Sequence, residues 1–226
     1  LWLQPYMTPN VPWDPVKDFA PITLVTTSPL VVAVHPSVPA KSVKELIALA
    51  KLKPGQLVYA SSGNGTPPHL AGEMFKTMAG IDFVHVPCKG TTTAYPDLVS
   101  GRVQMIFDGG AFLSQAKAGK VRMLAVASSR RVGFLPEIPG MAEAGVPGFD
   151  LVIWFGVVAP AGTPGPVIDR LSREIAEIVA LPTFKERFAR SGMELASNTP
   201  EAFGQLIRND IQKWTGLLRD AGVQPQ

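Results

Sequence analysis

Short apolar segments alternate with helical segments along most of this chain, and that alternation limits the available folds more than any other feature. The apolar segments are rich in β-branched residues and bounded by turn residues, at 22–25, 30–34, 57–60, 83–86, 103–107, 121–127 and 151–159. Helical patterns occupy 42–52, 67–79, 92–99, a short segment ending near 117, and three segments that begin after Thr163, Leu181 and Thr199. Strands alternating with helices predict an α/β fold with a mostly parallel sheet. In such sheets, ligands bind at the carboxyl ends of strands, beside helix N-termini.

Local signals mark several boundaries of these elements. Ser42 and Glu45 have the spacing of a capping box. Pro67 stands at the first position of the next helix and Gly80 at its end. Residues 1–21 carry five prolines, which predict an extended connector without helix.

Composition excludes several classes of protein. The 226 residues are 46% hydrophobic and 17% charged, as expected for a folded globular chain. The net charge is only +3 and no basic stripe occurs, so we expect no nucleic-acid partner. A single cysteine allows no intrachain disulfide, and the three histidines lack metal-ligand spacing, so neither a zinc site nor a cofactor is expected.

The segment Ser61-Ser62-Gly63-Asn64-Gly65-Thr66 joins a predicted strand to a predicted helix. Hydroxyls, an amide and two glycines beside a helix N-terminus can form a neutral site for an anion. The simpler interpretation is a tight turn in which Thr66 caps the helix. The residues alone leave these two interpretations balanced. His69, on the first turn of the helix, is either a catalytic base or, more often in such positions, a side chain bonded to nearby backbone.

Two further strand ends carry polar residues that can bind a ligand. Lys89-Gly90-Thr91 places a cation and hydroxyls before a helix, although Lys89 also fits a solvated surface lysine. Asp108 either accepts a hydrogen bond from a ligand or caps the following helix. Cys88 has no evident partner for nucleophilic chemistry. Because the strand ends after 60, 86 and 107 fall in one consecutive block, we expect them to share one edge of one sheet.

The sequence supplies binding groups but no catalytic set. It contains no marked carboxylate pair, no Gly-x-Ser-x-Gly elbow and no metal-ligand cluster. We therefore expect a binding protein and not an enzyme. A small hydrolase that uses His69 or Cys88 is the weaker alternative.

Five ordered motifs resemble those of the Bug-type periplasmic receptors of tripartite tricarboxylate transporters. They are WDPVKDFAPI from Trp13, SSGNGTPPHLAGE from Ser61, VPCKG from Val86, FLPEIPGMAEAG from Phe134 and APAGTP from Ala159. The resemblance implies a type II periplasmic-binding-protein fold, with two lobes that are joined by crossing strands and close over the ligand. One lobe is expected at 30–151, and the remainder of the other at 1–29 and 152–226.

The resemblance also implies a function, partners and a location. Receptors of this family bind a small carboxylic acid, such as a di- or tricarboxylate, an aromatic acid or an amino acid, and deliver it to membrane permease subunits. The protein is then expected in the periplasm. In the matching lobe, residues 61–66 are expected to bind the ligand's carboxylate.

Three departures from the family pattern set further expectations. About 70–90 N-terminal residues of the usual chain, roughly three strand–helix units, have no counterpart here. We therefore expect a truncated product or fragment that exposes apolar surface, binds ligand weakly or not at all, or completes itself as a dimer; an interaction-only product is the alternative. Cys88 and Gly109 stand where the family often has tyrosine and asparagine, which makes the side chains there smaller.

Overall fold

The computed structural model describes residues 2–6, 10–109 and 113–220. The chain divides into two compact units, one formed by residues 1–27 and 154–226 and the other by residues 28–153. The chain passes between them inside strands β1 (Phe19–Pro29) and β7 (Val152–Pro160). Each unit is described by itself below.

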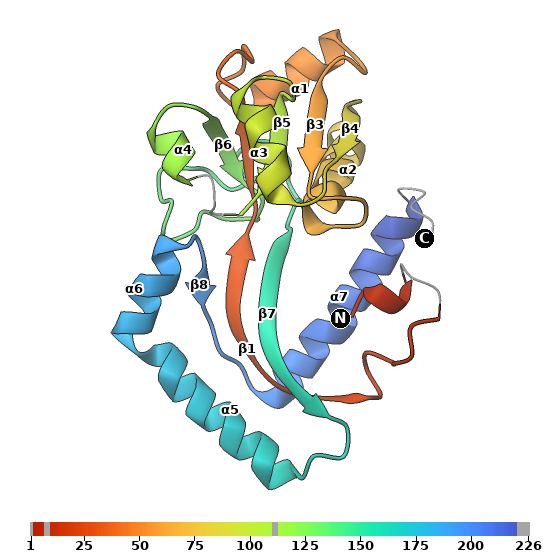
Figure 1. Cartoon of the computed structure of the whole chain (residues 1–226), viewed down its shortest axis with the longest axis vertical. Coiled ribbons are helices and arrows are strands. Elements are labelled where there is room, and N and C mark those ends of the chain that lie inside the picture. The colour runs from red at the N-terminus through yellow and green to blue at the C-terminus, as the bar shows by residue number, and fades with distance from the viewer. Residues whose placement is uncertain (1, 7–9, 110–112, 221–226) are drawn as a thin grey trace. The chain divides into compact units, whose positions relative to one another are not determined.

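Unit 28–153 is built on a five-stranded sheet in the order β4-β3-β5-β2-β6 (Figure 1). The strands are β2 (Val31–Val34), β3 (Val58–Ser61), β4 (Val84–Pro87), β5 (Met105–Asp108) and β6 (Arg122–Val126). β3 is parallel to β4 and β5, whereas β2 is antiparallel to β5 and β6. Among the described strands of this sheet only β2 is reversed, which confirms the predicted mostly parallel sheet.

The helices of this unit begin and end where the local chemistry directs them. They are α1 (Val43–Leu52), α2 (Pro67–Ala79), α3 (Thr91–Val99) and α4 (Leu113–Lys117). At α1, the Ser42 hydroxyl accepts from the Glu45 N–H at 3.2 Å, and the Glu45 carboxylate accepts from the Lys41 N–H at 2.7 Å. The capping box is confirmed, with its return bond one residue earlier than the standard pattern. Gly80 ends α2 in the left-handed conformation at φ 59°.

Helices α2 and α3 pack on opposite faces of the sheet. Because side chains alternate along a strand, Ala60 and Ile106 face α3 and form a core with Leu98. On the other face, Phe107 packs edge-on against Phe75 of α2, with ring centroids 5.8 Å apart. Both faces of this sheet are therefore buried, which explains its nearly continuous apolar strands.

Unit 1–27/154–226 contains a three-stranded sheet in the order β7-β1-β8. Its remaining elements are the 3-10 turn η1 (Gln4–Tyr6), helices α5 (Gly165–Ala180), α6 (Pro182–Arg190) and α7 (Pro200–Asp220), and strand β8 (Glu194–Leu195). Helix α7 covers one face of the sheet through Phe203 and Ile207, which pack on Leu24. The expectation of no helix in 1–21 needs a small correction, since Gln4–Tyr6 forms one 3-10 turn.

Helices α5 and α6 leave apolar side chains exposed. Val167, Leu171 and Ile178 of α5 are 45%, 39% and 46% exposed, and Phe184 of α6 is 39% exposed. The periodicity that predicts α5 thus forms a helix whose apolar face is only partly buried. No helix in the described part of the chain is long and apolar enough to cross a membrane.

Candidate functional site

The three predicted strand ends lie at one edge of the five-stranded sheet. Ser61 at the end of β3 pairs with Pro87 at the end of β4, and Ala60 pairs with Ile106 of β5. Parallel strands bring their carboxyl ends to the same edge, so the loops after Ser61, Pro87 and Asp108 meet there. This confirms the expectation that they share one edge.

Strand β2 starts at the same edge because it runs in the opposite direction. Its first residue, Val31, pairs with Asp108. The buried Ser28 stands just before it, and a side chain built on Gly109 would meet the Ser28 hydroxyl at 3.4 Å. Sequence reasoning did not count Ser28 among the site residues, because only the pairing of β2 with β5 brings it to this edge.

Residues 61–66, here called the serine-glycine loop, hold their shape mainly through internal bonds. The Thr66 hydroxyl donates to the Gly63 carbonyl at 2.7 Å, and the Ser61 hydroxyl accepts from the Gly63 N–H at 3.1 Å. Gly63 and Gly65 have φ of 130° and 70°, which only glycine adopts readily. Thr66 occupies the N-cap position of α2 without a capping bond from its side chain. The hydroxyls of Ser61 and Thr66 therefore shape the turn.

The N-terminus of α2 offers fewer donors than its position suggests. Pro67 and Pro68 have no N–H, so two donors of the first turn are missing. Ser62 is half-buried and Asn64 is exposed, and neither side chain has a hydrogen-bond partner among the described residues. The side chains of Ser62 and Asn64 thus remain open to a ligand, whereas the first turn of α2 supplies fewer N–H donors than the predicted anion site assumed.

Two stacked imidazole rings lie next to the loop. His69 and His85 have ring centroids 4.2 Å apart and an interplanar angle of 15°. The Gly65 N–H donates to His69 Nδ1 at 2.9 Å, which confirms the interpretation of His69 as a side chain bonded to nearby backbone. His85 Nε2 lies 2.7 Å from the Ser61 hydroxyl. Burial lowers the pKa of His69, and burial together with the neighbouring His69 lowers the pKa of His85 to about 4.

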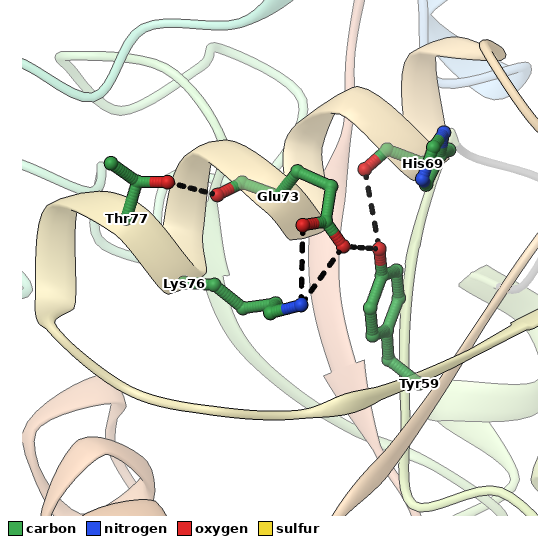
Figure 2. Close-up of polar contacts among 5 residues, drawn as sticks. All are labelled: Tyr59, His69, Glu73, Lys76 and Thr77. Carbon is green, nitrogen blue, oxygen red and sulfur yellow. Dashed lines mark hydrogen bonds and ion pairs between the residues drawn. The ribbon is translucent and has the colours of Figure 1, made fainter. Parts of the chain in front are cut away.

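A tyrosine and an ion pair support these rings. The Tyr59 ring stacks on His85 at 4.8 Å, and its hydroxyl donates to Glu73 at 2.7 Å (Figure 2). The Glu73 carboxylate also forms an ion pair with the Lys76 ammonium, with 3.1 Å between Nζ and Oε2. Burial and the neighbouring Glu73 raise the pKa of Tyr59, so it stays a hydrogen-bond donor. Sequence reasoning missed His85, Tyr59 and Glu73, because no local motif relates a strand histidine to a loop about twenty residues earlier.

The loop after β4 lies against the serine-glycine loop. The Cys88 and Gly90 N–H groups donate to the Ser61 and Ser62 carbonyls at 3.0 and 3.1 Å. Lys89, between these two donors, is exposed beside the loop. Gly90 precedes α3, whose first residue is Thr91; the Thr91 side chain lies outside the described part of the structure. Burial raises the pKa of Cys88, which disfavours a reactive thiolate.

Asp108 at the end of β5 is buried and paired. Its carboxylate accepts from the Tyr95 hydroxyl at 2.5 Å and from the Gly109 N–H at 2.8 Å. Burial raises its pKa, although both hydrogen bonds act in the opposite direction. These bonds hold the carboxylate within the sheet edge. Within the described residues, no group of three or more His, Cys, Asp or Glu side chains can hold a metal ion.

Comparison with known sequences identifies relatives over nearly the whole chain. Residues 2–223 match the sequence model described as "Tripartite tricarboxylate transporter family receptor". A UPF0065 protein from the tcbD-tcbE intergenic region of Pseudomonas sp. (strain P51) is 37% identical over 94% of this chain and 64% of its own length. Protein BugT of Bordetella pertussis is 33% identical over 96% of this chain and 67% of its own length. The chain thus spans about two thirds of the length of these curated relatives.

Solved structures show the same fold. R. palustris Rpa4515 with adipate is 32% identical, with a TM-score of 0.86 over 99% of this chain and 75% of that one. The periplasmic binding protein BugD is 33% identical, with a TM-score of 0.83 over 100% of this chain and 76% of that one. MatC from Rhodopseudomonas palustris with bound malate is 27% identical, with a TM-score of 0.77 over 94% of this chain and 74% of that one. The predicted α/β periplasmic-binding-protein fold is confirmed.

Proposed function

Because the chain belongs to the tripartite tricarboxylate transporter receptor family, whose members are periplasmic, non-catalytic solute receptors, we propose that it binds a small dicarboxylate in the periplasm. Two relatives guide the choice of ligand, since their structures contain adipate and malate. In this proposal, the bound acid is delivered to the membrane permease subunits of the transporter. The family is non-catalytic, so the alternative of a hydrolase that uses His69 or Cys88 is discarded.

One observation carries the proposal for the site. The edge formed by the ends of β4, β3 and β5 presents the Ser62 hydroxyl, the Asn64 amide and the Lys89 ammonium without a hydrogen-bond partner or ion pair among the described residues. A hydroxyl, an amide and a cation are suitable donors for a carboxylate. Gly63 and Gly65 leave the backbone of this loop open to close approach.

The site residues predicted from the sequence then have two roles in the proposal. Ser62, Asn64 and Lys89 contact the ligand directly, and the remaining site residues shape the surface that presents them. That second set is Ser61, Gly63, Gly65, Thr66, His69, Gly90, Thr91 and Asp108. We assign this ligand site to unit 28–153. The boundaries of this unit differ by two residues at each end from the lobe expected at 30–151.

The experiment is a titration of the chain with adipate and with malate by isothermal calorimetry. Replacing Ser62 and Asn64 together by alanine should weaken binding by about 5- to 150-fold, because removing these donors costs about 1–3 kcal/mol. The matched control is Thr77→Val, which removes a hydroxyl from the far end of α2 that bonds only to the Glu73 carbonyl. It should leave affinity unchanged.

Two results would contradict the proposal. If the Ser62/Asn64 double variant binds as tightly as the wild type, this loop does not bind the ligand. If neither acid, nor any member of a wider panel of dicarboxylates, binds the chain, the proposed activity is wrong for these 226 residues.

A further inference from the structure

The two stacked histidines bond to opposite ends of the serine-glycine loop. His85 of β4 contacts the hydroxyl of Ser61, the first residue of the loop, and His69 of α2 accepts from the N–H of Gly65, close to its last residue. The rings themselves are stacked at 4.2 Å. Ser62 and Asn64, two of the three proposed ligand donors, therefore lie between two points that are fixed to a single pair of rings.

The bond to Gly65 determines which form of His69 fits. A backbone N–H can only donate, so His69 Nδ1 must carry a lone pair and no proton. Protonation at Nδ1 would place a second N–H opposite the Gly65 N–H, with the two nitrogens 2.9 Å apart, and would remove the hydrogen bond between them. His69 therefore holds the loop only as a neutral imidazole.

Among the described residues that face the two rings, no carboxylate is free to pair with an imidazolium ion. The groups facing the two rings are Tyr59 of β3, and Glu73 and Lys76 of α2. The Glu73 carboxylate already accepts from the Tyr59 hydroxyl and from the Lys76 ammonium (Figure 2). Two imidazolium ions stacked at this distance would also repel each other.

We infer that His69 and His85 are positioning residues of the ligand site, a clamp that holds the serine-glycine loop in its binding shape only while His69 is uncharged. This inference rests on the proposed function for its consequence, a ligand affinity that falls as the clamp takes up a proton. The direction of both pKa shifts agrees, because both rings stay neutral in the neutral pH range. Neither ring needs to touch the ligand.

The first test needs no ligand. The imidazole nitrogens and the Gly65 amide are followed by NMR in the full chain from about pH 7.5 to about pH 4.5. We expect His69 as the Nε2–H tautomer, and a Gly65 amide signal that moves with the midpoint of His69, below the usual value of about 6.5. An Nδ1–H tautomer, or a Gly65 amide that does not follow His69, overturns the clamp.

Conservative variants distinguish a positioning role of the two histidines from a general contribution to the stability of the fold. In His69→Asn, the side-chain oxygen occupies the place of Nδ1 and cannot take up a proton in this range, and His85→Gln similarly preserves a partner for Ser61. The double variant is first compared with the wild type in its affinity for adipate at about pH 7.5. Its advantage over the wild type should grow as the pH falls through the His69 midpoint found by NMR. The titration of adipate itself is common to both proteins and cancels in the ratio.

The outcomes distinguish this inference from the proposed function. A ratio of affinities that stays constant with pH overturns the clamp, even if adipate binds well. If wild-type protein binds no adipate at about pH 7.5, the proposed ligand is wrong, and the Gly65 titration of wild-type protein still decides the clamp. His69→Leu, which removes the acceptor, should lose affinity at every pH where His69→Asn retains it.

Discussion

Replacing Gly72 with alanine tests the packing that supports the two histidines. Glycine inside a helix normally costs about 0.5–1 kcal/mol relative to alanine, so helix propensity alone predicts that the change stabilises α2. The structure predicts the opposite. An alanine Cβ at 72 would lie 2.2 Å from Cε2 and 2.4 Å from Cζ of Tyr59. Tyr59 is fully buried and stacks on His85, so its ring has no free space into which it can move.

The magnitude follows from what the tyrosine loses when it is displaced. Overpacking a filled core costs about 1–3 kcal/mol, and losing a hydrogen bond to a charged group costs about 1.5–3 kcal/mol. After the gain in helix propensity of about 1 kcal/mol, the net destabilisation is about 2–5 kcal/mol. For a chain of this size, each kcal/mol corresponds to about 2–4 °C, so the melting temperature should fall by about 4–20 °C.

The assay is thermal unfolding followed by circular dichroism, with Gly216→Ala as the matched control. Gly216 also lies within a helix, α7, but a Cβ there meets no described atom within 4 Å. That variant should be stabilised by up to about 1 kcal/mol. If Gly72→Ala is as stable as Gly216→Ala, the reasoning about Tyr59 is refuted.

Three further predictions concern titratable groups that are at least partly buried. The folded-state pKa of His85, about 4, lies below its unfolded value of about 6.5. The folded state therefore binds fewer protons, and stability should be full above about pH 6.5 and fall toward pH 4, by about 2 kcal/mol after solvent screening; urea unfolding at several pH values would show this, and a decline of the same size in His85→Gln would argue against it. Tyr95→Phe removes the donor to Asp108 and should cost about 1.5–3 kcal/mol at neutral pH, measured by urea unfolding, with a smaller cost where the carboxyl is protonated. Cys88, whose pKa is raised by burial, should react with iodoacetamide more slowly than a free thiol at pH 7, and mass spectrometry showing equal rates would contradict that expectation.

Local chemistry in the sequence predicted the elements well. Ser42, Pro67 and Gly80 act within one turn of a helix, so their effects can be read from a few neighbouring residues. The shared edge of the three strand ends was also predicted, because parallel strands in consecutive units have few other arrangements. The two-residue strand β8 was not predicted, since its pairing with Thr26 and Thr27 depends on residues far away in the chain.

The role of each hydroxyl in the serine-glycine loop depended on contacts that the sequence does not display. Ser61 and Thr66 matched the pattern of ligand donors as well as Ser62 did. Their positive-φ glycine partner, Gly63, turns both hydroxyls toward the loop's own backbone. Which donors stay available was thus decided by the turn's three-dimensional path.

The sequence by itself determined the α/β class, the helix boundaries and the polar strand ends, because each of these depends on periodicity and on interactions between near neighbours. Only the tertiary structure decided that His85 meets Ser61, that His69 stacks on His85, and that Tyr59 fits against Gly72. These contacts join β3, β4 and α2, and they exist only after the sheet has paired its strands in register. The sequence therefore contained the loop that we propose grips the ligand, while the fold supplied the rings that hold it.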